Sequence, residues 1–410
     1  MANAQKIFQI TGKIFSSPYD WGGKQLIPQT LGFTPEPDKP YAEYWLGVHP
    51  KALSQVALPN GKTDTLDHVI EANKETILGH SVAERFGRLP FLFKLLDAGE
   101  MLSIQVHPNK KQAEEGFARE EAAGIAFTDP KRTYKDDNHK PEFAVVQGDF
   151  WLLHGFRTED HLKKVLHEVP EFTPLIPYFE GGDYQKLYKY VMIDLSDEEV
   201  NKMMKTLAVR VVLAFEAGKL EKANPDYWAA KAIRYMNMSE DNYDRGLFSV
   251  YFLNLVNMKQ GQAIFQNAGL LHSYLEGPII EVMANSDNVA RGGITPKYVN
   301  IEELMKLVIF EGITPNVIEG REVDNEAFFD APIDEFAISK IQLGVDKPYK
   351  HTAISPEILI GMNGDAKITT DGNELSVSKG KSVFISAGTD YEIIGSGNDI
   401  VYRTSVPASK

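Results

Sequence analysis

The sequence predicts a mainly β protein that is interrupted by one helical insert. Short apolar stretches separated by Gly, Pro and Asn fill the chain up to about residue 157. Helical periodicity begins near Thr158 and ends near Asn242. A weak internal repeat then relates a segment after the helices to a segment near the C-terminus. Together these observations indicate two related β units with a helical domain inserted in the first.

The first β unit is expected to comprise residues 1–157 and 246–333. Its apolar stretches are short and bounded by turn residues, as in YAEYWLGVHP, LPFLFKLLDAG, MLSIQVHP and KPEFAVVQGDFWLLHGF. This texture is typical of β-sandwiches and barrels, so we interpret the region before Thr158 as mostly β.

Residues 158–245 carry the helical insert. Apolar residues recur at helical spacing in EDHLKKVLHEV, DEEVNKMMKTLAVRVVLAFEAGKLEK and YWAAKAIRYM. Ser196 and Glu199 form a capping box at the start of the middle helix. After this block, SVYFLNLVNM is expected to return to strand.

The internal repeat relates KQGQAIFQNAGLLHSY to SKGKSVFISAGTDYEI at a constant offset. Two copies of one β unit are indicated, although strings of turns and strands also match by chance in β proteins. His272 in the first copy corresponds to Tyr391 in the second. Residues 334–410 are therefore expected to form a C-terminal lobe that holds no metal.

Size and composition narrow the classes of function. A chain of 410 residues is too long for one core and should contain two or three packed units. The formal charge of −14 disfavours nucleic acid and anionic membranes as partners. No apolar run is long enough for a bilayer span or a signal peptide, so a cytoplasmic location is expected. Because the chain has no cysteine, a metal must be held by His, carboxylate or amide groups.

Four residues are candidates for such a site: Gln105, His107, Glu142 and His272. Gln105 and His107 are two apart, so on a strand they extend from the same face. Glu142 begins another strand in DDNHKPEFAV, and His272 lies in the first copy of the repeat. An amide, two imidazoles and a carboxylate suit zinc with a position left open, but iron or manganese would also fit.

A charged, glycine-containing segment, IIEVMANSDNVARGGITPK, supplies Glu281, Asp287, Arg291 and Lys297. An ion pair between Asp287 and Arg291 at the surface is the simplest interpretation. Beside a metal, Arg291 and Lys297 could instead neutralise a phosphate or an oxyanion. H-E-x-x-H, Walker A and G-x-G-x-x-G motifs are absent. The remaining histidines, including His49, lack partner motifs and are interpreted as structural.

These motifs resemble, closely and in order, those of the type I phosphomannose isomerases. The resemblance runs from about Ser17 to Lys297, through SSPYDWGG, PYAEYWLGVHP, LPFLFKLLDAGEMLSIQVHPNKK, DDNHKPEFAV and HSYLEGPIIEVMANSDNVARGGITPK. It implies a cupin fold with two jelly-roll β units and an α-helical domain. It also implies one zinc ion per chain, held by Gln105, His107, Glu142 and His272. One departure is that Leu271 precedes the last ligand, where the family commonly has Pro.

The same resemblance implies interconversion of mannose 6-phosphate and fructose 6-phosphate, within mannose metabolism and the supply of GDP-mannose. The partner would be a small sugar phosphate, and the chain a monomer or weak homodimer. The implied catalytic groups are Arg291, Lys140, His139 and Asp287. The implied substrate-binding groups are Lys297, Glu281, Lys94, Ser103, Trp21 and Glu43.

The reaction requires a base and an electrophile, since one proton moves between C1 and C2 through an enediol(ate). Zinc and Arg291 could stabilise the developing charge. His139, Asp287 and Lys140 are each candidates for the base, and the sequence does not rank them. Two alternatives remain: a non-haem metal oxygenase, which also uses two His and a carboxylate, and a cupin that binds sugar phosphates without catalysis.

Overall fold

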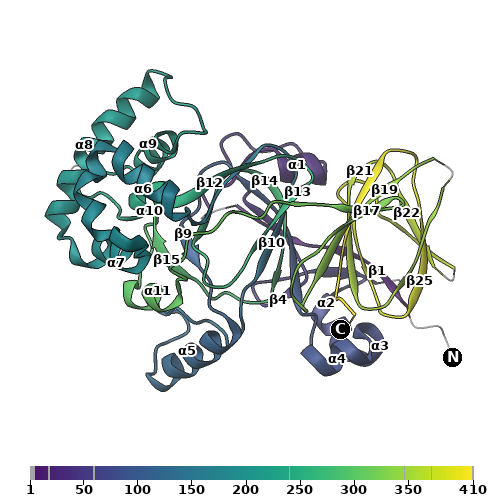
Figure 1. Ribbon diagram of the computed structural model, residues 1–410. Coiled ribbons are helices and arrows are strands. Elements are labelled where there is room, and N and C mark those ends of the chain that lie inside the picture. Colours follow the sequence, from purple (N-terminus) through teal and green to yellow (C-terminus); the bar gives the residue numbers. More distant parts are fainter. Residues whose placement is uncertain are drawn as a thin grey trace.

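The computed structural model describes residues 5–16, 19–58, 61–239, 241–345, 347–370 and 372–408. Ser17 and Pro18 of the SSPYDWGG motif lie outside the described residues. Figure 1 shows helices at one end, a β core in the middle, and a second group of strands at the other end. The predicted fold class, mainly β with a helical insert, is confirmed.

An 11-stranded sheet forms the middle region. Its main path runs β16-β13-β10-β14-β8-β3-β2; β9 and β11 also pair with β14, while β15 pairs with β9 and β12 pairs with β11. The strands are β2 (Lys13–Phe15), β3 (Glu43–Leu46), β8 (Phe91–Ala98), β9 (Ile104–Val106), β10 (Glu142–Val146), β11 (Phe150–Phe156), β12 (Leu253–Met258), β13 (Gln262–Gln266), β14 (His272–Ala284), β15 (Ala290–Gly293) and β16 (Ile318–Glu319). Every residue of β8 and β10 is buried, which explains their nearly continuous apolar sequences.

The long strand β14 connects the parts of this sheet. Its first residue, His272, pairs with Gln105 of β9, and farther along Glu281 pairs with Lys94 of β8. It also pairs with β10 and β11. Residues that are far apart in the sequence are thereby brought to one region of the sheet.

The second group of strands comes from both ends of the chain. A nine-stranded sheet has the order β17-β18-β19-β26-β21-β24-β1-β6-β7, and a four-stranded sheet has the order β20-β25-β22-β23. Their strands are β1 (Ile7–Thr11), β6 (Gln55–Ala57), β7 (Thr63–Thr65), β17 (Arg321–Val323), β18 (Glu326–Phe329), β19 (Ala337–Leu343), β20 (Tyr349–Ala353), β21 (Glu357–Asn363), β22 (Lys367–Thr370), β23 (Asn373–Ser376), β24 (Ser382–Ile385), β25 (Thr389–Ile394) and β26 (Asp399–Ser405). A separate two-stranded ribbon joins β4 (Val48–His49) to β5 (Ala52–Leu53).

The predicted division into units is crossed by hydrogen bonds between strands, because β18 pairs with β19 across residue 334 and β1 also pairs with the C-terminal lobe. Strand β1 pairs with β24 from Ile7 opposite Ile385 to Ile10 opposite Ser382. The start of the chain therefore completes a sheet of the C-terminal lobe. As domain boundaries, residues 158, 246 and 334 stay a prediction.

The helical insert contains the predicted helices. They are α6 (Glu159–Glu168), α8 (Asp197–Glu216) and α9 (Pro225–Tyr235), joined by short helical turns η1 (Pro170–Tyr178), η2 (Glu180–Gly182), α7 (Tyr184–Lys189) and η3 (Tyr190–Asp194). The capping box of Ser196 and Glu199 is confirmed, with reciprocal side-chain to backbone hydrogen bonds at the start of α8. In the described residues no helix is both long enough and apolar enough to cross a bilayer.

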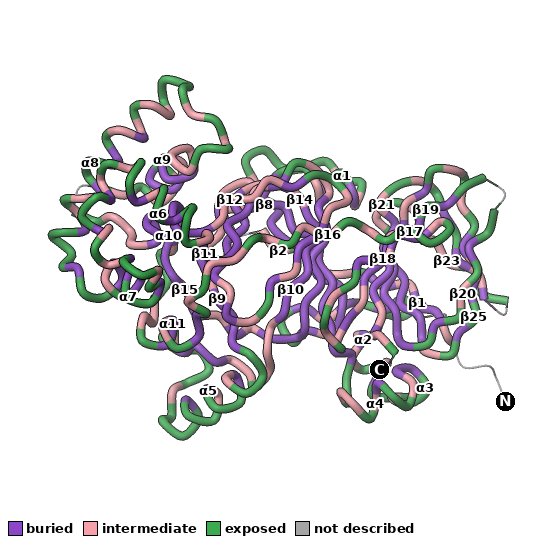
Figure 2. Tube along the Cα trace, in the orientation of Figure 1, coloured by how far each residue is buried: buried purple, intermediate pink, exposed green. Residues whose placement is uncertain are grey.

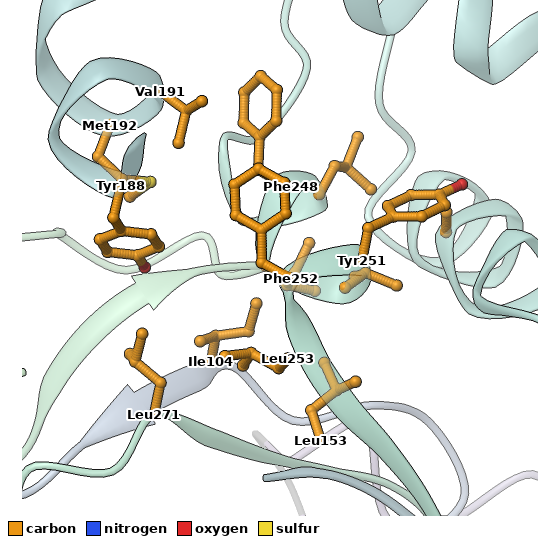
Figure 3. Close-up of a cluster of buried hydrophobic side chains, with 14 of the residues drawn as sticks. Ile104, Leu153, Tyr188, Val191, Met192, Phe248, Tyr251, Phe252, Leu253 and Leu271 are labelled. Carbon is orange, nitrogen blue, oxygen red and sulfur yellow. The ribbon is translucent and has the colours of Figure 1, made fainter. Parts of the chain in front are cut away.

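The insert packs against the back of strands that carry site residues. Figure 3 shows Ile104 and Leu271 beneath Tyr188, Phe252 and neighbouring rings of the helical core. Both aliphatic side chains are almost fully buried. Because side chains alternate along a strand, Gln105 and His272 extend to the opposite face from these neighbours. Figure 2 shows buried segments running through the middle sheet into the helical region.

Several helices were not predicted from the sequence. SVYFLNLVNM, expected to be strand, is helical in α10 (Gly246–Phe252) and becomes extended only from Leu253 in β12. All residues of α10 are buried, so its sequence lacks the polar face that distinguishes a helix from a buried strand. The remaining helices are α1 (Leu26–Leu31), α2 (Leu66–Ala72), α3 (Lys74–Leu78), α4 (His80–Phe86), α5 (Lys110–Ala122) and α11 (Ile301–Leu307).

The two segments of the repeat adopt the same local structure. Gly261 and Gly380 precede β13 and β24 with φ of 89° and 78°, and Gly269 and Gly388 follow with φ of 81° and 70°. A positive φ favours glycine, which explains why these positions match in the sequence. The prediction of two related β units agrees with this geometry.

Candidate metal centre and active site

Three buried side chains from separate strands converge in the middle sheet. His107 follows β9, Glu142 begins β10 and His272 begins β14. The Nε2 atoms of His107 and His272 each lie 3.3 Å from a different carboxylate oxygen of Glu142. Their ligand atoms all lie within 4.8 Å of one another. This spacing matches a set of ligands that surrounds one ion.

Hydrogen bonds fix the orientation of both imidazoles. The Nδ1 of His107 lies 2.8 Å from the carbonyl oxygen of Asn288, and the Nδ1 of His272 lies 2.9 Å from that of Leu270. Since a carbonyl oxygen only accepts, each Nδ1 carries the hydrogen and each Nε2 presents a lone pair. Burial, together with the nearby ammonium of Lys140, lowers the pKa of His107 to about 4, so this ring is neutral.

This arrangement requires a cation. Both Nε2 lone pairs face a carboxylate, and the two Nε2 atoms and Glu142 Oε2 are buried without a hydrogen-bond partner. Such groups are costly to bury unless they are shared with a positive charge. Two imidazoles and a carboxylate are a donor set that zinc prefers. The residues therefore fit a divalent metal ion.

Gln105 and Arg291 lie on the same side of this part of the sheet. Gln105 is opposite His272 in the pairing of β9 with β14, and opposite Arg291 in the pairing of β9 with β15. Directly opposed residues extend from the same face. Ser103, two residues before Gln105, is half-buried. The amide, the guanidinium and the last imidazole thus extend from one face of the sheet.

A second cluster of charges is centred on Lys94. Its Nζ lies 2.8 Å from Glu281 and 3.3 Å from Glu43, and 5.0 Å from the centre of the Trp45 ring. Burial alone would lower the pKa of Lys94, but the carboxylates of Glu281 and Glu43 outweigh burial and raise it. Lys94 is therefore a fixed ammonium, and both carboxylates are already paired.

Lys140 and Asp287 provide further charges near the metal ligands. The Nζ of Lys140 lies 2.8 Å from Glu142 Oε1. The carboxylate of Asp287 is 2.7 Å from the Nζ of Lys51 and 3.6 Å from the Nε2 of His49. Burial raises the pKa of Asp287, but the effects of Lys51 and His49 are larger together and lower it, so the net change is a decrease. Asp287 is thus held ionised at the pocket.

Arg291 and Lys297 place two positive charges near each other. Burial lowers the pKa of Arg291. Desolvation, followed by the positive charges of Arg291 and Lys51, lowers the pKa of Lys297. In both residues the effect of burial outweighs the nearby acidic group, so an anion that binds between these cations would stabilise their charged forms. The side chains therefore favour an anionic ligand.

The turn after Arg291 holds an unusual backbone. Ile294 has φ of 51°, and Gly293 has φ of 120°. A side chain at Gly293 would collide with Asp244 and Gly246 at the start of α10. A positive φ in a β-branched residue is strained and is found mostly at functional sites. The helical insert thereby contributes to the placement of β15 and of Arg291.

Comparison with known proteins identifies the family. The model of the type I phosphomannose isomerase catalytic domain matches residues 7–159. The mannose-6-phosphate isomerase of Escherichia coli is 38% identical over 378 residues, which cover 90% of this chain and 92% of the relative. The chain belongs to the type I phosphomannose isomerase family. The mannose-6-phosphate isomerase of Macaca fascicularis is 32% identical, with 85% of each chain covered.

Solved structures of this isomerase family support the same assignment. A zinc-bound mannose 6-phosphate isomerase superimposes with a TM-score of 0.85 at 34% identity, covering 98% of this chain and 100% of the other. The Salmonella typhimurium enzyme bound to its substrate fructose 6-phosphate and to zinc gives a TM-score of 0.86 at 34% identity and the same coverage. The agreement extends over both β units and the insert.

Two predicted site residues of this isomerase-family chain have other partners. The Nε2 of His139 lies 2.5 Å from Glu335, which precedes β19 of the C-terminal lobe. Trp21 is half-buried: its carbonyl accepts hydrogen bonds from Gly99 and Glu100, and its ring lies 5.7 Å from that of Tyr19. His139 is therefore directed toward the second lobe.

Three pocket residues were not singled out from the sequence. His49 and Lys51 contact Asp287, and the charges of Glu43, Lys94 and Asp287 act on Tyr19. His49 was interpreted as structural because it lacks a partner motif nearby. All three occur in or beside the segments SSPYDWGG and PYAEYWLGVHP, and this proximity was the available signal.

Proposed function

We propose that this chain interconverts mannose 6-phosphate and fructose 6-phosphate with one zinc ion. The observation that carries the proposal is the convergence of His107, Glu142 and His272, whose two Nε2 atoms and Oε2 atom are buried without a hydrogen-bond partner. Membership of the family and the relative bound to fructose 6-phosphate and zinc support the isomerase rather than the oxygenase or the binding protein.

We further propose that Gln105 completes the metal site with its amide oxygen. The register of β9 against β14 supports this role, because it places Gln105 opposite His272. When bound, zinc supplies a Lewis acid that polarises sugar oxygens and favours the enediolate. The other groups bind the substrate and move its protons.

Arg291 and Lys297 are proposed to hold the anionic parts of the substrate. Arg291 is always cationic and presents several donors, so it suits a phosphate or a developing oxyanion. The lowering of the pKa of Lys297 by burial and by the charges of Arg291 and Lys51 supports an anion between these groups. Lys94, Glu281, Glu43, Ser103 and Trp21 are proposed to contact and orient the sugar.

Asp287 is proposed as the base that removes the carbon-bound proton. Among the acidic residues near the metal ligands, Glu142 faces the two metal-binding imidazoles, while Glu281 and Glu43 are almost fully buried beside Lys94. Asp287 is ionised and partly accessible, with a side chain 22% exposed. Lys140 is proposed to stabilise negative charge, because its ammonium already lies beside Glu142. His139 is proposed to anchor the segment that carries both Lys140 and Glu142.

The proposed organisation follows the expected units, with 1–157 and 246–333 catalytic, 158–245 helical and 334–410 as the second lobe. We also propose a cytoplasmic enzyme, monomeric or weakly dimeric, because a phosphorylated sugar is charged and does not cross membranes. The acidic chain is not expected to bind nucleic acid or membranes.

A coupled assay of fructose 6-phosphate formation tests the function. Activity should appear with about one zinc per chain, disappear with a chelator and return with zinc. An oxygenase would consume oxygen without forming the isomer. A binding protein would shift its melting temperature with the sugar phosphate but would form no product, and either result contradicts the proposal.

A further inference from the structure

His49 occupies a central position beside the proposed base. It ends β4, its side chain is 6% exposed, and its ring meets that of Trp45 edge-on at 5.0 Å. Its Nε2 faces Asp287 Oδ2 at 3.6 Å, a distance longer than a hydrogen bond. Asp287 Oδ2 is instead held by Lys51 at 2.7 Å. The Nε2 of His49 therefore lies beside the carboxylate of Asp287 without a short hydrogen bond to it.

The local backbone determines which nitrogen of His49 carries the hydrogen. The amide N–H of Lys51 donates to His49 Nδ1 at 3.3 Å. Nδ1 is therefore an acceptor, and the hydrogen of the neutral ring is on Nε2. Burial lowers the pKa of His49 to about 4; Asp287 opposes this decrease, whereas Lys94, Lys51 and Lys140 add to it. At neutral pH the ring is uncharged and its Nε2–H points toward Asp287.

The reaction needs a group of this kind. After the base removes the proton from C2 of the open-chain aldose, O1 must gain a proton and O2 must lose one before C1 is protonated. A guanidinium only donates, and the ammonium groups of Lys94 and Lys140 are paired with carboxylates. A neutral imidazole can donate its Nε2 hydrogen, and the imidazolate that results can then accept a proton at the same nitrogen. Catalysis by a neutral imidazole beside a carboxylate base is known for triose phosphate isomerisation.

We propose that His49 is a further catalytic residue, which transfers a proton between O1 and O2 of the enediolate while Asp287 transfers the carbon-bound proton. The inference rests on the proposed function of the site. The Nε2 hydrogen passes first to O1, which leaves an imidazolate, and Nε2 then takes the hydroxyl proton from O2, so the ring ends in its starting protonation state. Asp287 then returns its proton to C1, and the ketose is formed with no net change in either residue.

The test separates carbon deprotonation from isomerisation. Mannose 6-phosphate deuterated at C2 is incubated with each variant, and both fructose 6-phosphate formation and loss of deuterium from recovered substrate are measured. In H49Q we expect kcat for isomerisation to fall about 100-fold, as for loss of a general acid–base group, with KM changed by less than about 3-fold. Deuterium loss should fall much less, because Asp287 still forms an enediolate that now persists longer. The ratio of exchange to turnover therefore rises.

Several outcomes are distinguishable. D287N should lose exchange and turnover together. If H49Q also loses both in parallel, His49 only supports Asp287 and the inference is overturned. The matched control H68Q, at an exposed histidine paired with Asp64, should change neither rate. If the unchanged chain forms no fructose 6-phosphate, the proposed function itself fails.

Zinc content and melting temperature are measured for every variant. If H49Q does not fold, H49N is judged by the same ratio of exchange to turnover. If neither folds, the unchanged chain labelled with 15N-histidine gives the answer, with His49 assigned through its contact with the Trp45 indole. An Nε2–H tautomer at pH 7 whose resonance shifts when mannose 6-phosphate is added supports the proposal. An Nδ1–H tautomer, a charged ring or an unshifted resonance overturns it.

Discussion

The phenol of Tyr391 donates a 2.8 Å hydrogen bond to Oε2 of Glu357, in the second lobe. This pair repeats the geometry of His272 and Glu142, whose Nε2 and Oε2 lie 3.3 Å apart. The strand registers agree: Glu142 is opposite Gln266 and Glu357 is opposite Ile385, the corresponding positions of the repeat. The second lobe therefore contains the counterpart of the metal centre.

In that counterpart other residues replace the remaining ligands. His351 lies opposite Tyr391 as Gln105 lies opposite His272. The carbonyl of Ala353 accepts from Gly388 as that of His107 accepts from Gly269, so a methyl group stands where an imidazole is needed. In the second lobe the positive charge beside these carboxylates belongs to a side chain. The guanidinium of Arg403 lies 2.6 Å from Glu326 and 3.8 Å from Glu357.

Replacing Arg403 should destabilise the second lobe. R403M leaves Glu326 and Glu357 buried without their cation, and breaking a buried pair costs about 3–5 kcal/mol. Zinc content should not change. Unfolding in urea measures the loss, and R403M/E326Q should recover part of it. Equal stability of R403M and the unchanged chain would contradict the role of Arg403.

The substitution H272Y should convert the first centre to the type found in the second lobe. The new phenol would donate a hydrogen bond to Glu142, and the imidazole ligand would be lost. Loss of a hydrogen bond to a ligand lowers metal affinity roughly 10–100-fold, so loss of the ligand itself should lower zinc affinity by more than this. Metal analysis after dialysis and the isomerase assay measure this. Retention of about one zinc per chain would exclude His272 as a ligand. The substitution Y391H should not create a zinc site, because position 353 remains alanine.

The acid side of the pH profile should depend on Lys51. Burial raises the pKa of Asp287, whereas Lys51, His49 and Lys140 lower it, so the ionised base persists to lower pH. As pH falls through this pKa, the base is protonated and kcat/KM decreases. K51M removes one cause of the lowering, so its acid limb should move to higher pH. The control K379M, at an exposed lysine of the second lobe, should keep the original profile.

The contact of Glu335 with His139 should connect the second lobe to catalysis. E335Q removes the negative charge of this 2.5 Å pair, and the segment that carries Lys140 and Glu142 should lose part of its alignment. We expect kcat to fall about 10-fold, with the melting temperature nearly unchanged. The neighbouring D334N, whose partner Arg85 is 3.4 Å away at an exposed carboxylate, is the control. Equal activity of both variants would exclude this role for Glu335.

The sequence by itself determined the features that depend on near neighbours or on ordered motifs. The amphipathic helices α6, α8 and α9, the Ser196 capping box and the glycine turns of the repeat were all predictable, because their stabilising contacts lie within a few residues. The ligand types and the family followed from motifs in a fixed order.

Only the tertiary structure decided what depends on distant segments. The pairing of β1 with β24, the guanidinium in the second centre and the contact of His49 with Asp287 join residues that are far apart in the sequence. Local propensity carries no information about such pairs, because their energy comes from burial and charge that exist only after the sheets assemble. For the same reason the role of His49 could not be predicted, because no partner residue lies near it in the sequence. Its contact with Asp287 forms only when β4 folds against the loop that carries Asp287.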